Sequence, residues 1–153
     1  MPNKSTPEIL AFRRRLLRWF RRHGRDLPWR RTRDPYAVLV SEFMLQQTQV
    51  SRVTGYYGRF LSRYPSVHHL AEAEPAAVRE SWQGLGYYRR AANLHQLART
   101  VVREHAGIIP AATGVLMQLP GVGRYTAGAV ASFAFEQAEP AVDTNVEIGR
   151  AHV

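Results

Sequence analysis

The sequence contains no cysteine, which excludes disulfides, zinc–thiolate sites and cysteine-bound iron–sulfur clusters within its 153 residues. It has no apolar run long enough to cross a membrane, and its first residues lack the apolar core of a signal peptide. We therefore expect a cytoplasmic protein that has no membrane partner.

Acidic residues are also scarce, with 12 Asp and Glu against 21 Lys and Arg, and the formal net charge is +9. A surface of that sign attracts polyanions, and nucleic acid is the commonest polyanion in a cell. An inert basic surface would have the same composition, so charge alone leaves both interpretations open. An apolar fraction of 45% in a chain of this length indicates one folded domain with a sizeable core.

Capping side chains, prolines and glycines divide the chain into a series of helices. In Thr6–Pro7 and Asp34–Pro35 a side-chain oxygen that can cap a helix precedes a proline suited to the first helical turn. Gly84, Gly86 and Gly107 mark the ends of other segments whose apolar residues recur at helical spacing. The predicted helices cover about 7–23, 35–47, 50–64, 67–74, 75–83, 88–104, 114–119 and 124–134. No segment alternates as a strand would, so the predicted fold class is all-α with one core.

A glycine-containing turn joins the last two predicted helices within the segment LPGVGRYTAGAV, residues 119–130. We expect Gly121 and Gly123 to permit left-handed or crowded backbone there. The free backbone N–H groups of the turn and the positive N-terminus of the next helix would hold a phosphate. Such a hairpin binds a DNA backbone without reading bases, and a plain helix–turn–helix corner is the alternative. The candidate contact residues are Leu119, Gly121, Val122, Gly123 and Arg124.

Glu42 lies on an otherwise apolar helix, within the segment VLVSEFMLQQTQV. Loss of water around a carboxyl there raises its pKa and makes it a candidate proton donor. The alternative is a structural glutamate that pairs with a backbone group or an arginine. Gln46 and Gln47 end the same helix, and they are either plain exposed residues or amides that contact a disturbed base stack.

Asp143 follows an apolar pair in the segment AVDTNV, where it would cap a coming helix. Capping is compatible with catalysis, because a carboxylate held beside a sugar stabilises the positive charge that develops in glycoside cleavage. Glu42 would then protonate a leaving base, Asp143 would stabilise the sugar cation, and water would complete the hydrolysis. Such an enzyme must first rotate the nucleotide out of the duplex.

Six segments resemble, in the same order, the adenine DNA glycosylase (MutY) family of the helix-hairpin-helix DNA glycosylase superfamily. The resemblance covers about residues 7–146 and implies a six-helix barrel domain plus the N-terminal helix of an incomplete second domain. It also implies a nucleoid-associated monomer that removes adenine mispaired with 8-oxoguanine or guanine from double-stranded DNA. Full-length members carry a 4Fe–4S cluster, whose four cysteines are absent here. The matching segments are LPWR 27–30, DPY 34–36, SEFMLQQTQV 41–50, GLGYYRRAANL 84–94, LPGVGRYTAGA 119–129 and AVDTNV 141–146.

The resemblance implies roles at four catalytic positions. Glu42 matches the general acid, and Asp143 matches the carboxylate that stabilises the cation. Tyr125 and Asn145 match two further active-site residues. Glycosylase/lyases of a sister branch carry a lysine nucleophile where Tyr125 stands, so a monofunctional hydrolase that forms no Schiff base is implied. The alternatives are such a glycosylase/lyase and a non-catalytic DNA-binding module, although neither acid would help a module bind a polyanion.

Five other positions match residues that contact the substrate. Trp29, Arg30 and Leu45 match residues that line the adenine pocket. Gln47 and Tyr87 match residues that wedge into the duplex beside the lesion. No residue of this chain is a predicted metal ligand.

The resemblance ends near Val146, and the last residues read EIGRAHV. Back-translated and followed by a stop codon, they correspond to a sequencing-library adapter, so we interpret 147–153 as a non-native tail and 1–146 as an incomplete catalytic domain. We expect the first helix to leave its apolar face partly exposed, and the chain to be marginally stable, to bind DNA weakly and to have little or no activity. Amplifying the locus from genomic DNA tests the interpretation, and a genuine EIGRAHV end would refute it.

Overall fold

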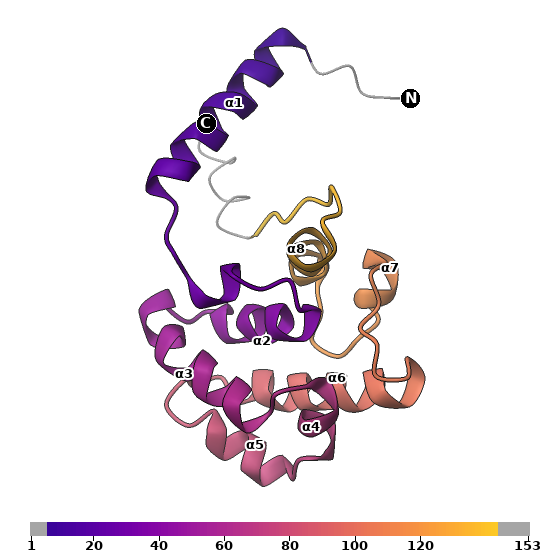
Figure 1. Cartoon of the computed structure of the whole chain (residues 1–153). Coiled ribbons are helices and arrows are strands. Elements are labelled where there is room, and N and C mark those ends of the chain that lie inside the picture. Colours follow the sequence, from indigo (N-terminus) through magenta and orange to yellow (C-terminus); the bar gives the residue numbers. More distant parts are fainter. Residues whose placement is uncertain (1–5, 144–153) are drawn as a thin grey trace.

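The computed structural model describes residues 6–143, and every regular element in that range is helical (Figure 1). The all-α class predicted from the sequence is therefore confirmed. The elements are, in chain order, α1 (Pro7–His23), the 3-10 turn η1 (Pro28–Arg30), α2 (Pro35–Leu45), α3 (Val50–Arg63), α4 (Val67–Glu72), α5 (Pro75–Ser81), α6 (Arg89–Glu104), α7 (Thr113–Leu116) and α8 (Arg124–Phe135).

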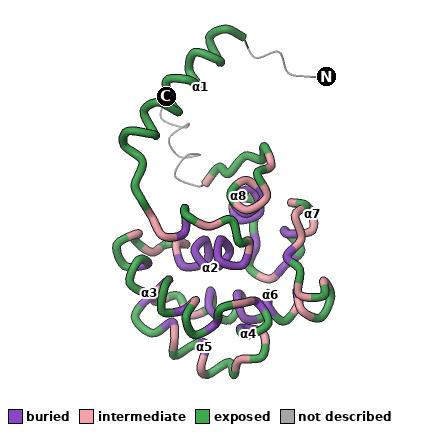
Figure 2. The backbone as a smooth tube through the Cα atoms, in the orientation of Figure 1, coloured by how far each residue is buried: buried purple, intermediate pink, exposed green. Residues whose placement is uncertain are grey.

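Helix α2 forms the centre of the core because its sequence has almost no polar face. Its residues Tyr36–Met44 are all buried, and the helix contacts η1, α3, α6 and α8. Asp34 caps the first turn by accepting a hydrogen bond from the Tyr36 backbone N–H at 3.1 Å. Figure 2 shows this buried helix among elements in which buried and exposed residues alternate. A polar side chain on α2 is therefore enclosed by other elements.

Helix α1 lies apart from this core (Figures 1 and 2). None of its residues is buried, and its large apolar side chains are 41–64% exposed. The expected exposure of its apolar face is thereby confirmed. No helix within residues 6–143 has the length and apolar character needed to cross a lipid bilayer. The exposed apolar residues of α1 are Ile9, Leu10, Phe12, Leu16, Leu17, Trp19 and Phe20.

Two helices differ from the sequence prediction. The sequence predicts α2 as far as Gln47, but the helix ends at Leu45, because Gln46 leaves the helical conformation with a ψ of 112° and Gln47 is left-handed with a φ of 55°. Thr113 is the first residue of α7 rather than its cap, and the helix ends at Leu116 instead of Leu119. A hydrogen bond from the Leu119 backbone N–H to the Leu116 carbonyl, at 3.0 Å, closes a turn in place of further helix. The other helix ends agree within two residues, as is usual for helix boundaries.

Candidate active site

Glu42 is buried on α2, and its side chain is only 1% exposed. Its Oε1 atom lies 3.8 Å from the Arg30 guanidinium and has no hydrogen-bond partner among the described residues. Burial raises the pKa of Glu42, while the charge of Arg30 and a hydrogen bond from the Tyr125 hydroxyl act in the opposite direction. Burial is the largest of these effects, so the site favours the protonated carboxyl, which can donate a proton.

Tyr125 connects the two acids that the sequence singles out. It lies half-buried in the first turn of α8, and its pKa is raised to about 12. Burial is the main cause, and the negative charges of Glu42 and Asp143 contribute in the same direction. The hydroxyl therefore stays neutral at physiological pH and can donate a hydrogen bond. Because both carboxyls act on one hydroxyl, α2 and the segment that follows α8 converge on the same site.

Gly128 allows the chain after α8 to return toward this site. A Cβ atom at Gly128 would lie 2.2 Å from the carbonyl oxygen of Pro140, so only glycine lets residues 139–141 rest on the helix. The segment then reaches Asp143, the last residue that the structure describes. The helix that Asp143 is expected to cap, Asn145 and the expected tail at 147–153 lie outside the described residues.

The predicted pocket residues occupy different depths. Arg30 is held between two partners, since its guanidinium lies 3.7 Å from the centre of the Phe133 ring as well as beside Glu42. Trp29, its neighbour in η1, is 1% exposed and packs within the core, with its ring edge-on to that of Tyr57 at 5.4 Å. Leu45 is half-buried and packs against the core. Of the three, Arg30 is the one that forms an ion pair with Glu42.

The turn between α7 and α8 is anchored by apolar side chains. Leu119 and Val122 are 4% and 7% exposed, so they hold the turn against the core and their side chains are not available to a ligand. Gly121 has a φ of 75°, and a Cβ atom there would lie 2.9 Å from atoms of both Asn93 and Phe43. Gly121 therefore meets the expectation of a left-handed and crowded position.

Gly123 differs from that expectation. Its φ of −93° is open to any residue, and nothing lies within 4 Å of a Cβ atom placed there. It stands at the N-cap of α8, where glycine has no side chain that could cap the first N–H groups of the helix. Arg124 is exposed beside them. The arrangement suits an anion that approaches the backbone closely, because the helix dipole and the free N–H groups point to the same place.

Residues 40–151 match the family model described as HhH-GPD superfamily base excision DNA repair protein. The chain belongs to this superfamily. Adenine DNA glycosylase of Rattus norvegicus is 49% identical over 148 residues, which cover 91% of this chain and 29% of the rat protein. Adenine DNA glycosylase of Mycobacterium tuberculosis is 48% identical over 132 residues, covering 86% of this chain and 43% of that protein. The chain thus spans less than half the length of these relatives.

Solved structures of the superfamily share its helical arrangement. A thermostable thymine-DNA glycosylase superposes with a TM-score of 0.84 at 32% identity, over 89% of this chain and 63% of that one. Endonuclease III in a non-covalent complex with DNA superposes with a TM-score of 0.77 at 26% identity, over 92% of this chain and 66% of that one. The described part of the chain therefore shares its fold with these structures.

Two loops of this HhH-GPD chain bring Gln47 and Tyr87 to one surface. Both side chains are exposed, and together with Leu85 they line a hollow of about 620 Å³. Both residues also have left-handed backbone, with φ values of 55° and 48°, which is uncommon for residues other than glycine. Gln46 is half-buried, and its carbonyl accepts a hydrogen bond from Arg90. The loops thus present the two side chains side by side.

Sequence reasoning missed two residues that shape the site, Arg90 and Gly128. Arg90 is 7% exposed and lies on the buried face of α6, three residues after the exposed Tyr87. Its position in register with the buried Ala91 and Leu94 predicts its burial only weakly, since the other arginines within residues 6–143 are exposed. Gly128 lies inside a helix, where glycine is unfavourable, and such a position indicates close packing.

No group of three or more His, Cys, Asp or Glu side chains within residues 6–143 is placed to hold a metal ion. The resemblance implies a 4Fe–4S cluster in longer relatives, and such a cluster is held by cysteine thiolates. The chain has no cysteine, so its residues do not supply ligands for the cluster.

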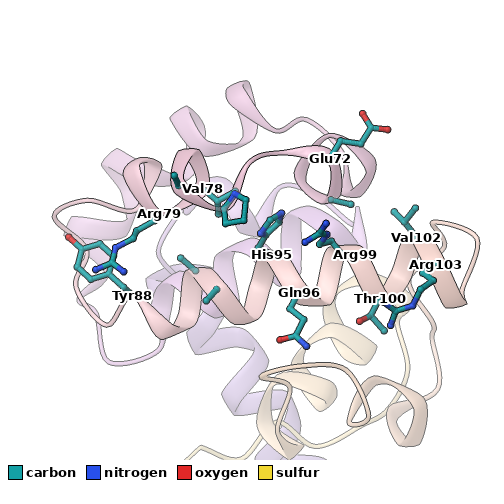
Figure 3. Close-up of a pocket in the computed structure, with 15 residues that line it drawn as sticks. Glu72, Val78, Arg79, Tyr88, His95, Gln96, Arg99, Thr100, Val102 and Arg103 are labelled. Atoms are coloured by element: carbon teal, nitrogen blue, oxygen red, sulfur yellow. The ribbon is translucent and has the colours of Figure 1, made fainter.

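Another hollow lies away from the Glu42 site. It has a volume of about 920 Å³ and lies between α4, α5 and α6, where Arg79, Arg99 and the buried His95 line it (Figure 3). Burial and the charge of Arg99 lower the pKa of His95. None of the residues that the sequence predicts for catalysis or DNA contact lines this groove.

Proposed function

We propose that the chain is the catalytic domain of an adenine DNA glycosylase, which hydrolyses the N-glycosidic bond of adenine mispaired with 8-oxoguanine or guanine in double-stranded DNA. We further propose that it acts as a monomer. The observation that carries the proposal is the buried Glu42 carboxyl, whose Oε1 atom has no hydrogen-bond partner and lies 3.8 Å from Arg30, beside a Tyr125 hydroxyl that also feels the charge of Asp143. The similarity to adenine DNA glycosylases supports the choice of base.

In the proposed reaction the protonated Glu42 donates its proton to a ring nitrogen of the flipped adenine. The bond between the base and C1′ of the sugar then breaks, and its electron pair leaves with the base. The Asp143 carboxylate stabilises the resulting oxocarbenium ion. A water molecule adds to C1′ and releases a proton, which restores the Glu42 carboxyl.

Tyr125 and Arg30 set the state of the acid in this mechanism. The neutral Tyr125 hydroxyl donates a hydrogen bond to Glu42, and Arg30 places a positive charge 3.8 Å from Oε1. Both interactions stabilise the carboxylate that remains after proton transfer, which limits how far burial raises the pKa of Glu42. Glu42 can therefore give up its proton within the site.

The α7–α8 turn supports a role in holding the duplex. The open N-terminus of α8, with Gly123 and Arg124, supplies N–H groups and a positive side chain for one phosphate. Gln47 and Tyr87 would enter the base stack, where an exposed aromatic ring can replace the contacts of the displaced base. A net charge of +9 makes the affinity for DNA fall as salt is added.

Adenine release under single-turnover conditions, with protein in excess over a duplex containing an adenine–8-oxoguanine mispair, tests the proposal. Glu42→Gln should slow release at least ~100-fold, because the general acid is removed, while affinity for the duplex stays within ~2-fold. Glu72→Gln is the matched control, because Glu72 is an exposed acid in the hollow between α4, α5 and α6, away from the Glu42 site. It should release adenine at the unaltered rate. Incubation times are extended as far as the stability of the chain allows, so that slow release can be measured. Equal rates for the two variants would show that Glu42 is not the acid.

A further inference from the structure

Arg90 binds the end of α2 and the loop that follows it. Its Nη1 atom donates hydrogen bonds to the carbonyl oxygens of Phe43 at 3.0 Å, Met44 at 2.7 Å and Gln46. Its Nη2 atom donates to Thr48 Oγ1 at 2.9 Å. The last carbonyls of a helix carry the negative end of its dipole, so they are suitable partners for a buried cation. Arg90 thereby binds the residues on both sides of Gln47, through the Gln46 carbonyl and the Thr48 side chain.

The same guanidinium binds a second loop, between α5 and α6. Nη2 also donates to the carbonyl oxygens of Leu85 at 3.3 Å and Gly86 at 3.0 Å. The centre of the guanidinium lies 5.5 Å from the Tyr87 ring and 5.5 Å from that of Trp82. One side chain therefore holds the backbone immediately before Tyr87 and contacts its ring.

We propose that Arg90 is a positioning residue that joins these two loops into one rigid, two-pointed wedge whose points are Gln47 and Tyr87. The inference rests on the proposed function, because the wedge acts by entering duplex DNA. Both points have left-handed backbone and are exposed, so neither conformation is favoured by its own side chain or by burial. The hydrogen bonds from Arg90 hold both conformations and set the spacing between the two points.

Arginine is required at this position because its planar fork reaches partners on two sides at once. A lysine keeps the positive charge at the end of α2 but is a single point donor, and it cannot hold both loops. Arg90→Lys therefore keeps the positive charge but removes the hydrogen bonds that join the two loops. Arg89→Lys is the matched control, since it makes the same change one residue earlier on α6 at an exposed side chain.

Amide hydrogen exchange in the free protein tests the bridge itself. Arg90→Lys should speed exchange in both loops, at residues 46–48 and 85–87, while Arg89→Lys should leave both unchanged. Faster exchange in one loop alone, or in neither, would overturn the claim that Arg90 couples them.

Fluorescence of 2-aminopurine, placed in a duplex beside the mispaired adenine, tests the function of the bridge. Arg90→Lys should reduce both the unstacking signal and the affinity for this duplex by ~10-fold, the usual effect of losing one aromatic stacking contact. A duplex in which the mispair lies within an unpaired bubble needs no wedge, so its affinity should change by less than ~2-fold. An equal loss on both duplexes would indicate a general structural effect and would refute the proposal.

A double-mutant cycle with Tyr87→Ala decides whether Arg90 acts through the wedge. In that background Arg90→Lys should have less than ~2-fold further effect on affinity for the duplex, whereas independent effects would multiply. If Arg90→Lys does not fold, Thr48→Val, which removes one acceptor of the bridge, goes through the same cycle. These measurements need no base cleavage, so a chain that shows the coupling but releases adenine equally fast with and without Glu42→Gln would refute the proposed function alone. A chain without affinity for duplex DNA would refute both.

Discussion

Gly128 provides a sharp test of how the chain after α8 reaches the active site. In Gly128→Ala the new Cβ atom would lie 2.2 Å from the Pro140 carbonyl oxygen, whereas ordinary contacts begin at 3.4 Å. Residues 139–141 must therefore move by about 1 Å. Asp143 lies just beyond this segment, so the carboxylate should move with it.

Two opposing effects determine the stability of Gly128→Ala. Alanine is favoured over glycine inside a helix by about 0.5–1 kcal/mol, while forcing an extra methyl into a packed contact costs about 1–3 kcal/mol. The net change should be a loss of about 1 kcal/mol, or about 3 °C in Tm for a domain of this size. Gly58→Ala in α3 is the matched control, because nothing lies within 4 Å of a Cβ atom at Gly58. It should raise Tm by about 3 °C.

Scanning calorimetry of both variants and single-turnover adenine release give the two readouts. Gly128→Ala should slow release by about 100-fold, the usual effect of displacing a catalytic group by 1 Å, and Gly58→Ala should leave the rate unaltered. If Gly128→Ala raises Tm as much as Gly58→Ala does, residues 139–141 do not rest on α8. The structural explanation for the position of Asp143 would then be wrong.

Three further predictions concern the acid, the turn and the nucleophile. Burial raises the pKa of Glu42 above its ordinary value of 4.5, so the folded state loses stability as the pH rises from 4.5 through the raised pKa. The loss is about 1.4 kcal/mol for each tenfold difference between the acid dissociation constants of Glu42 in the folded and unfolded states. Urea unfolding should thus find Glu42→Gln more stable than the unaltered chain at pH 8 and equal to it near pH 4.5, and equal stabilities at pH 8 would contradict the burial argument. Gly121→Ala should lower Tm by several degrees, because Gly121 has a positive φ and a Cβ atom there would press on Asn93 and Phe43. Gly123→Ala should keep Tm but weaken the affinity for DNA. A Gly123→Ala chain that loses Tm but keeps its affinity for DNA would exclude the phosphate site. Borohydride treatment during turnover should trap no protein–DNA adduct, since Tyr125 offers no amine, and a trapped adduct would favour the glycosylase/lyase alternative.

The position of Gln47 shows where sequence reasoning failed. The apolar pattern of α2 and the following glutamines predict helix as far as Gln47, and nothing local interrupts it. The helix ends two residues earlier, and Arg90, some 45 residues along the chain, binds the carbonyls at that end. A partner so distant leaves no trace in the local pattern.

The catalytic candidates show the opposite case. Glu42 can be singled out in the sequence, because it is an ionisable residue within an otherwise apolar helix, where burial of a charge is unfavourable. The structure confirms that Glu42 is buried and that its pKa is raised. What the sequence does not contain is the meeting of Glu42, Tyr125 and Asp143, which come from three segments.

The sequence alone determined the helical class, the caps of the first helices, the buried character of α2 and the superfamily, because these depend on interactions among residues a few positions apart and on long matching segments. Only the tertiary structure decided that Tyr125 links the two acids, that Gly128 admits the returning chain and that Arg90 ties two loops together. Each of these depends on side chains that meet across the core, and packing rather than local preference sets such distances.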